Sequence, residues 1–152
     1  MNIINILREH LTAQVADGAV SETHYGWAEQ FNNVAGRCQT PVSFLVTPTK
    51  WKLNIDTVRA RESGVFVINF LDKQPQLDFD AVANEAVIDS MIDVAVDLVG
   101  RLRSDTRIRI EDVEVDPRSI YDANNKNLTG VQLALRIIEN KGRCIPTKPI
   151  YG

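Results

Sequence analysis

One short apolar run constrains the fold of this chain more than any other feature. Residues 65–71 read Val-Phe-Val-Ile-Asn-Phe-Leu, so the strand that they predict is apolar on both faces. Such a strand must be covered on both sides, by helices or by another protein surface. A turn over residues 72–77 and one long helix over residues 80–103 follow it, and one helix covers only one side. The pattern therefore favours a protein that assembles with other chains.

The remaining elements are predicted from hydrophobic periodicity and from turn residues. Apolar residues recur every four positions from Ile3 to Val15 and predict an amphipathic helix over residues 2–16, which ends at Asp17-Gly18. A hairpin tip is expected over residues 47–52, and a polar loop over residues 117–127. Strands are expected over residues 42–46, 53–60, 65–71, 107–115 and 131–137, with a turn at Ser63-Gly64 and a β-bulge at Glu111-Asp112.

These elements define the expected fold class and domain organisation. The class is α+β, in the order helix, three strands, long helix and two strands, with a mainly antiparallel sheet covered on one face by helices. The length of 152 residues fits one domain, which we expect over residues 1–140. Residues 18–40 are polar and too numerous for a turn, so they form either an extended arm or a functional loop. Residues 141–152 contain two prolines and predict an extended C-terminal tail.

The sequence carries no recognisable catalytic, nucleotide-binding or metal-binding motif. His10 and His24 are the only histidines, and a structural role or solvent exposure is favoured over catalysis for both. Cys38 and Cys144 lack metal spacing and are expected to be free thiols, because the N-terminus lacks the basic region of a secretory signal. A net charge of −3 offers no overall attraction for nucleic acid or anionic membranes. We therefore expect a non-enzymatic protein without cofactor or metal, synthesised inside a cell.

An acidic ridge is predicted along one face of the long helix. It consists of carboxylates spaced four residues apart, namely Glu85, Asp89, Asp93 and Asp97. Each like-charge pair at this spacing destabilises a helix by about 0.2–0.5 kcal/mol. The ridge is either a solvated face, a metal site or a surface that pairs with basic residues of a neighbouring chain. A straight row with steps of about 6 Å does not converge on one ion, which disfavours the metal site.

A basic cluster follows the ridge, at the end of the helix and the start of the next strand. It consists of Arg101, Arg103, Arg107 and Arg109, with Arg59 and Arg61 before the central strand. These residues either complement the helix dipole and line an exposed strand, or bind nucleic acid, or contact the acidic ridge of a neighbouring subunit. Head-to-tail contacts of the last kind close into rings.

Aromatic and apolar residues outside the predicted core are further interface candidates. They are Tyr25, Trp27, Phe31, Trp51, Ile150 and Tyr151. The three aromatics of residues 18–40 either fold back onto the core or contact a neighbouring chain, because aromatics are enriched in the centres of interfaces. Trp51 lies between two lysines, and the proline-containing tail is suited to docking on another protein.

The element order over residues 1–140 resembles the tail terminator proteins of long-tailed bacteriophages and the related neck ring proteins between portal and tail. The matching elements are the helix from Ile3, the strands at Val42 and Val65, the helix from Asp80, and the strands at Arg107 and Val131. The resemblance implies a virion protein, made in the host cytoplasm, that forms a hexameric or dodecameric ring at the head–tail junction.

The resemblance also implies which partners such a protein has. They are further copies of the chain and the portal, connector and tail proteins of the same particle. No membrane is implied, and contact with DNA would be limited to passive contact in the channel. Two alternatives from other classes stay open. One is a small α+β enzyme whose pocket uses the loops at Asp78, Asp80 and Tyr121-Asp122, and the other is a binding adaptor that stays monomeric.

Overall fold

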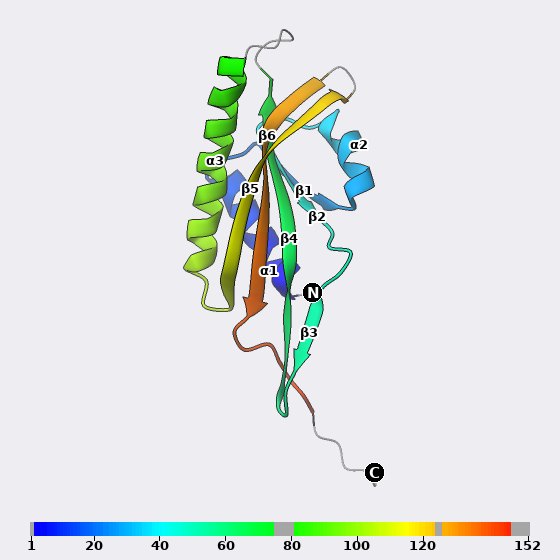
Figure 1. The fold of residues 1–152 in the computed structure, drawn as a ribbon, viewed down its shortest axis with the longest axis vertical. Coiled ribbons are helices and arrows are strands. Elements are labelled where there is room, and N and C mark those ends of the chain that lie inside the picture. The colour runs from blue at the N-terminus through cyan, green and yellow to red at the C-terminus, as the bar shows by residue number, and fades with distance from the viewer. Residues whose placement is uncertain (1, 75–80, 124–125, 147–152) are drawn as a thin grey trace.

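The computed structural model describes residues 2–74, 81–123 and 126–146. These residues form an α+β fold with one mixed sheet of seven strands. The helices are α1 (Asn2–Ala16), α2 (Phe31–Ala35) and α3 (Ala81–Arg103), with a 3-10 helix η1 at Ala28–Gln30. The strands are β1 (Glu22–Gly26), β2 (Val42–Val46), β3 (Lys52–Ile55), β4 (Arg59–Lys73), β5 (Ile108–Ala123), β6 (Lys126–Glu139) and β7 (Arg143–Cys144) (Figure 1).

The sheet is organised around β4, the strand that contains the apolar run 65–71. The strand order is β1-β2-β4-β6-β5, and β3 and β7 pair with the beginning of β4. β1 and β2 are parallel, whereas the other neighbouring strands are antiparallel. Because β4 is much longer than β2, it extends past the end of its neighbour, and β3 occupies the position that β2 leaves. The strand thus belongs to two regions of the molecule.

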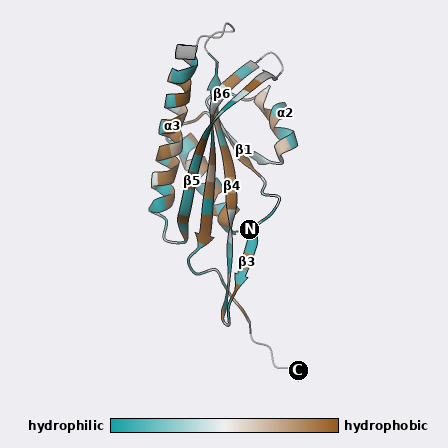
Figure 2. Cartoon of the chain, viewed as in Figure 1, coloured by the Kyte–Doolittle hydropathy of each residue, from teal (hydrophilic) through white to brown (hydrophobic). Residues whose placement is uncertain are grey.

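Helices α1 and α3 cover one face of the sheet and form the main core with it. Side chains alternate along β4, and Phe66, Ile68 and Phe70 all point toward these helices. Figure 2 shows the same hydrophobic character along β4 and β6. α1 ends as the sequence predicts, because Gly18 adopts a φ of 79° that favours glycine. The predicted helices over residues 2–16 and 80–103 are confirmed, except that residue 80 lies outside the described part of the chain.

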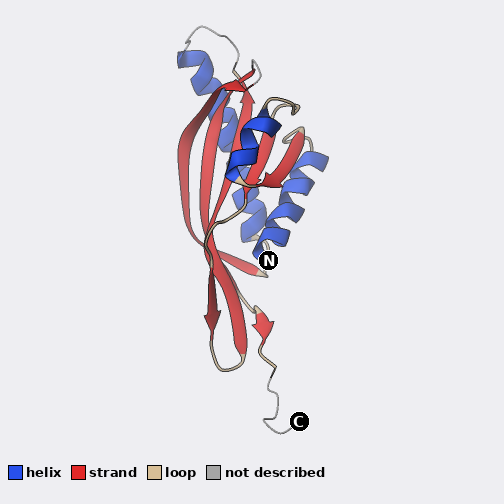
Figure 3. Ribbon diagram, turned by 90° about the vertical axis from the view of Figure 1, so that its right-hand side faces the viewer, coloured by secondary structure: helices blue, strands red, loops and turns tan. Residues whose placement is uncertain are grey.

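The opposite face of the sheet is covered at one end by α2. Phe31 of this helix packs against Phe44 of β2, with ring centroids 4.5 Å apart, in a second and smaller core. Figure 3 shows the short helix lying across the strands. The expectation that helices cover only one face is therefore wrong. Residues 22–35, expected to be an extended arm or a loop, instead form β1, η1 and α2, because their apolar residues complete this second core.

Three predicted turns or loops differ in the part of the chain that the structure describes. β4 runs without interruption through Ser63-Gly64, where a Cβ on the glycine would lie 3.1 Å from the Cβ of Trp51. The glycine therefore allows a close approach and makes no turn. Residues 47–52 are a connection between two partners of β4, so they are not a hairpin tip. Most of residues 117–127 extend the β5–β6 hairpin and do not form a loop, although residues 124–125 are outside the description.

The predicted strand over residues 53–60 is interrupted in the structure. β3 ends at Ile55, and the carboxylate of Asp56 accepts hydrogen bonds of 2.8 Å from the backbone N–H groups of Val58 and Arg59. Aspartate favours such turns because its short side chain reaches the backbone two residues ahead. The predicted strand over residues 42–46 is confirmed, and so is the bulge, which lies between Ile110 and Asp112.

Candidate assembly surface

A β-sheet arm projects from one end of the molecule. We define the arm as residues 50–63 and 141–146, which contain β3, the beginning of β4 and β7. Figures 1 and 3 show that it extends beyond the helices along the longest axis. Four large apolar side chains of the arm are between 43% and 67% exposed, namely Trp51, Leu53, Ile55 and Val58. Exposed apolar side chains concentrated in one projection are typical of a surface that binds another protein.

The arm has an apolar face and a basic face. In the β3–β4 register, Leu53 lies opposite Glu62 and Ile55 lies opposite Ala60 on one face. Alternate residues point the other way, so Lys52 and Arg61 share the second face. Arg59 lies two residues before Arg61 and therefore points to this basic face as well. The arm is thus amphipathic, and the N-terminus of α1 contacts it at its base.

The arm is strongly basic within an acidic chain. Its six basic residues outnumber the two carboxylates of Asp56 and Glu62, so its net charge is +4, whereas that of the whole chain is −3. The remainder of the chain therefore carries −7. The basic residues are Lys50, Lys52, Arg59, Arg61, Lys141 and Arg143. Of these six residues, only Arg143 forms an ion pair with a described residue. Its guanidinium lies 3.2 Å from the Oε2 atom of Glu62.

Two buried glutamates attach the arm to the N-terminus of α1. Oε2 of Glu62 accepts a hydrogen bond of 3.1 Å from the backbone N–H of Asn2, and Oε2 of Glu139 accepts one of 3.2 Å from the Asn2 side chain. Oε1 of Glu139 also accepts a 2.8 Å hydrogen bond from the backbone N–H of Glu62. A helix N-terminus stabilises nearby carboxylates because its free N–H groups carry partial positive charge. The base of the arm is therefore fixed although its tip is exposed.

The acidic ridge of α3 is exposed, but only part of it lacks an ion-pair partner within the described residues. Glu85, Asp89 and Asp93 are exposed and form none. Asp97 instead accepts hydrogen bonds of 2.9 Å from the Gln14 side chain and 2.8 Å from Nε of Arg101. These two bonds, that of Gln14 first, lower the pKa of Asp97. The ridge that remains free for other contacts consists of Glu85, Asp89 and Asp93.

Most of the predicted basic cluster is engaged within the chain. Arg101 also pairs with Asp17, and Arg109 lies 3.2 Å from Glu111. Arg107 pairs with Glu9 and Asp105, each at 2.7 Å. Arg107 lowers the pKa of Asp105 far below its usual range, and the nearby His10 contributes to this shift. Arg103 is exposed and forms no ion pair with another described residue. Arg101, Arg107 and Arg109 are thus poorer candidates for intersubunit pairing than the basic residues of the arm.

The aromatic candidates differ in exposure. Phe31 is buried in the second core, so its assignment to an interface is wrong and the alternative of folding back onto the core is correct. Trp27 and Trp51 are exposed, and Tyr25 is partly covered by Arg8, whose guanidinium carbon lies 5.2 Å from the ring centroid. Two further candidates, Ile150 and Tyr151, lie outside the described residues.

The apolar face of the arm is not predicted by the sequence pattern. Leu53, Ile55 and Val58 lie in residues 53–60, which are predicted to be a strand although the apolar period breaks between Ile55 and Val58. Their exposure depends on which neighbours β3 receives, and hydrophobic periodicity does not contain that information. The available signal was the surrounding charge, because basic residues flank this apolar segment on both sides.

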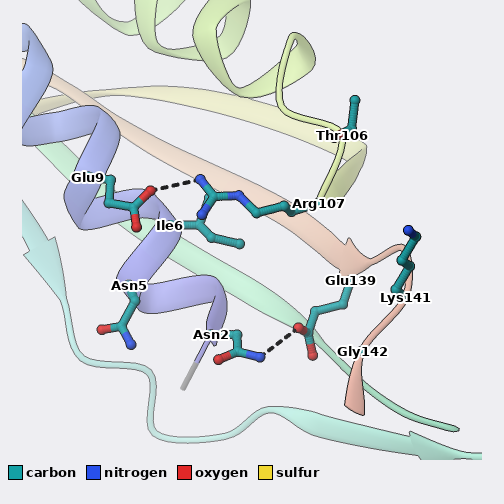
Figure 4. Close-up of a pocket in the computed structure, with 9 residues that line it drawn as sticks. All are labelled: Asn2, Asn5, Ile6, Glu9, Thr106, Arg107, Glu139, Lys141 and Gly142. Atoms are coloured by element: carbon teal, nitrogen blue, oxygen red, sulfur yellow. Dashed lines mark hydrogen bonds and ion pairs between the residues drawn. The ribbon is translucent and has the colours of Figure 1, made fainter. Parts of the chain in front are cut away.

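A polar cavity of about 470 Å³ lies between α1 and the end of β6 (Figure 4). Its residues include the Glu9–Arg107 ion pair and the Asn2–Glu139 hydrogen bond. None of the described residues that line this cavity is a histidine or a cysteine. For the alternative enzyme pocket, Asp78 and Asp80 lie outside the described residues, and only the backbone is described for Tyr121 and Asp122. Four of the polar side chains that line the cavity are thus engaged with one another in two pairs.

No protein-family model matches this chain, and no curated protein matches it. Within the described residues, no three histidine, cysteine, aspartate or glutamate side chains gather where they could hold a metal ion. None of the described helices is long and apolar enough to cross a membrane. The exposed arm and the free part of the acidic ridge are the candidate assembly surfaces of this chain.

Proposed function

We propose that this chain is a structural protein that assembles with copies of itself into a ring at the head–tail junction of a tailed bacteriophage. The observation that carries the proposal is the arm, whose four large apolar side chains are exposed although the main core is well packed. Exposing these side chains to water is unfavourable, and burial against another protein removes that cost. Their position on a projection favours contacts between chains over a binding pocket.

The element order supports the choice of the phage junction. A helix, a set of strands, one long helix and a final antiparallel pair occur in the order expected from the tail terminator and neck ring proteins. This chain adds β1, η1 and α2 after the first helix and the short β7 at the end. In the proposed ring, each subunit contributes its arm to a neighbour, and portal, connector and tail proteins bind the two rims.

The proposed function is tested by measuring the oligomeric state of the purified protein alone and with portal and tail proteins of the same phage. We expect rings in mass photometry and negative-stain images, and we expect the protein at the junction of intact particles. Replacing two arm residues, Leu53→Ser with Ile55→Ser, should reduce ring formation, whereas Val115→Ser, at an exposed position of β5, serves as a matched control. A chain that stays monomeric alone and with every such partner contradicts the proposal.

A further inference from the structure

Two oppositely charged surfaces of this chain have no ion-pair partners within the described residues. On the arm, Lys52, Arg59 and Arg61 share the basic face and pair with no described carboxylate. On α3, Glu85 and Asp89, together with Asp93, form the free part of the acidic ridge. Of the basic cluster at the end of α3, Arg101, Arg107 and Arg109 already pair with carboxylates of their own chain, whereas Arg103 is a single charge that is unpaired within the described residues. The arm is therefore the complementary partner that the same chain offers.

The distance between successive charges is similar on the acidic ridge and on the basic face of the arm. Residues four apart on an α-helix are separated by about 6 Å along its axis. Alternate residues of a β-strand, such as Arg59 and Arg61, are separated by about 6.8 Å. A strand laid along the helix can therefore place successive basic residues against successive carboxylates. Arginine and lysine side chains are long enough to absorb the remaining difference of less than 1 Å in each step.

The contact must join two molecules. Figure 1 shows the beginning of α3, which carries Glu85 and Asp89, at the end of the longest axis opposite the arm. One chain therefore cannot bring its own arm to its own ridge without losing its fold. A contact between different surfaces of identical chains is heterologous, and it closes into a ring when the rotation between subunits permits.

We propose that the basic face of the arm docks on the Glu85/Asp89/Asp93 ridge of a second copy of this chain. The inference rests on the self-assembly part of the proposed function, and it names the surfaces that meet. The carboxylates of the ridge repel one another within the isolated helix, and the partner's basic residues relieve this repulsion. The contact is exposed at its edges and is therefore weakened by salt.

Charge reversal on each surface tests the contact. The arm variant carries Lys52→Glu and Arg59→Glu, and the ridge variant carries Asp89→Lys and Asp93→Lys. Each should weaken self-association about tenfold or more at low salt, because attraction becomes repulsion. A matched control reverses Glu114 and Asp116, two exposed carboxylates of β5, to lysine and should leave the association unchanged. Sedimentation velocity over a concentration series measures the effect, and circular dichroism verifies the fold.

Mixing the two variants gives a sharper result than either alone. In the arm variant two glutamates replace two of the three basic residues on the basic face, and the ridge stays acidic. The ridge variant keeps the basic arm and has two lysines and Glu85 in its ridge. In an equimolar mixture every contact joins opposite charges, so assembly should return with the two variants alternating around the ring. If a reversed variant fails to fold, the neutral pairs Lys52→Gln with Arg59→Gln and Asp89→Asn with Asp93→Asn replace it, and both should weaken association.

The outcomes separate this inference from the proposed function. If the wild-type protein forms rings and both charge-reversed variants form them equally well, the arm–ridge contact is overturned but the proposed function as a ring protein stands. Arm–ridge assembly of a chain that is absent from the junction of intact particles supports the contact and contradicts the phage function. A wild-type chain that stays monomeric at low salt and high concentration overturns the contact. Loss of duplex DNA binding in the arm variant with unchanged association also overturns it, because the arm would then be a nucleic-acid surface.

Discussion

The strand β4 contributes to two regions that contrast in almost every physical respect. In the body of the molecule, Phe66, Ile68 and Phe70 of this strand are fully buried under α1 and α3. In the arm, the beginning of the same strand pairs with β3, which is exposed along its whole length. The body is therefore stabilised by hydrophobic burial, whereas the arm depends on backbone hydrogen bonds and on the buried glutamates at its base.

This contrast teaches that apolar content alone does not identify a core. Both regions contain large aliphatic and aromatic side chains, but only the body has two layers that enclose them. A two-stranded hairpin has little stability in isolation, so the arm persists because β4 continues into the sheet and because β7 adds a third strand. Apolar residues of the arm should therefore matter for binding and little for folding.

The largest expected difference between the two regions concerns leucines. Leu98→Ala removes a fully buried side chain between α3 and the sheet and should lower the free energy of unfolding by about 2–5 kcal/mol. Leu53→Ala in the arm should change it by less than about 0.5 kcal/mol, because half of that side chain is already exposed. Urea unfolding followed by circular dichroism, at concentrations where the protein is monomeric, measures both. Equal losses would mean that the arm belongs to the folding core.

The two regions should also differ in how much a carboxylate contributes to stability, and this contribution depends on pH. Asp105 in the body contacts Arg107 and His10, and its pKa is lowered mainly by the hydrogen bond from Arg107. A folded-state pKa below the unfolded value of about 3.9 stabilises the fold above that pH. Asp105→Asn should therefore lower the free energy of unfolding by about 1–3 kcal/mol at pH 7. This difference from the wild type should shrink as the pH falls below about 4.

The arm supplies the control for this pH dependence. Backbone hydrogen bonds from Val58 and Arg59 also lower the pKa of Asp56, but this carboxylate is fully exposed at the tip of the arm. Asp56→Asn should therefore change the global stability much less than Asp105→Asn at neutral pH. Thermal unfolding from pH 3 to pH 7 compares the two variants. A constant effect of Asp105→Asn over this range would show that its charge does not stabilise the fold.

Sequence periodicity predicted the parts of the fold that depend on one dominant face. Both α1 and α3 present a regular apolar stripe to the sheet, so their predicted bounds agree with the structure to about one residue. The bulge was predictable because the alternation of β5 shifts at Glu111-Asp112, and the register shift lies there. These signals are local, and no knowledge of the neighbouring strands is needed to interpret them.

The errors occur where the environment of a segment is set by distant residues. Residues 22–26 are polar, yet they form a strand because β2 offers a free edge beside them. Residues 117–123 contain a proline and several polar side chains, and they remain in β5 because they pair with β6 and lie at the edge of the sheet. The free part of the acidic ridge was likewise unpredictable, since the pairing of Asp97 depends on Gln14 of another helix.

Two glycines with positive φ give the smallest and most local contrast. Gly18 ends α1 in the body with a φ of 79° and has open space around the position of a Cβ. Gly18→Ala should therefore lower the free energy of unfolding by about 1 kcal/mol, because of backbone strain alone. Gly142 in the arm has a φ of 67°, and a Cβ there would collide with the carbonyl oxygen of Ala60. The local distortion in Gly142→Ala should be greater, because strain and collision act together.

For the free energy of global unfolding we expect the opposite order, in which Gly142→Ala destabilises the protein less than Gly18→Ala. Gly142→Ala detaches β7 from Ala60, but the arm opens locally, so the free energy of global unfolding should fall by less than about 0.5 kcal/mol. Hydrogen exchange should instead show faster exchange at Ile145, whose N–H donates to the carbonyl of Val58 at 2.8 Å, with unchanged exchange in α1 and β6. In Gly18→Ala the exchange at Ile145 should stay as in the wild type. Global destabilisation by Gly142→Ala larger than that by Gly18→Ala would show that arm and body unfold as one unit, and the distinction between them would fail.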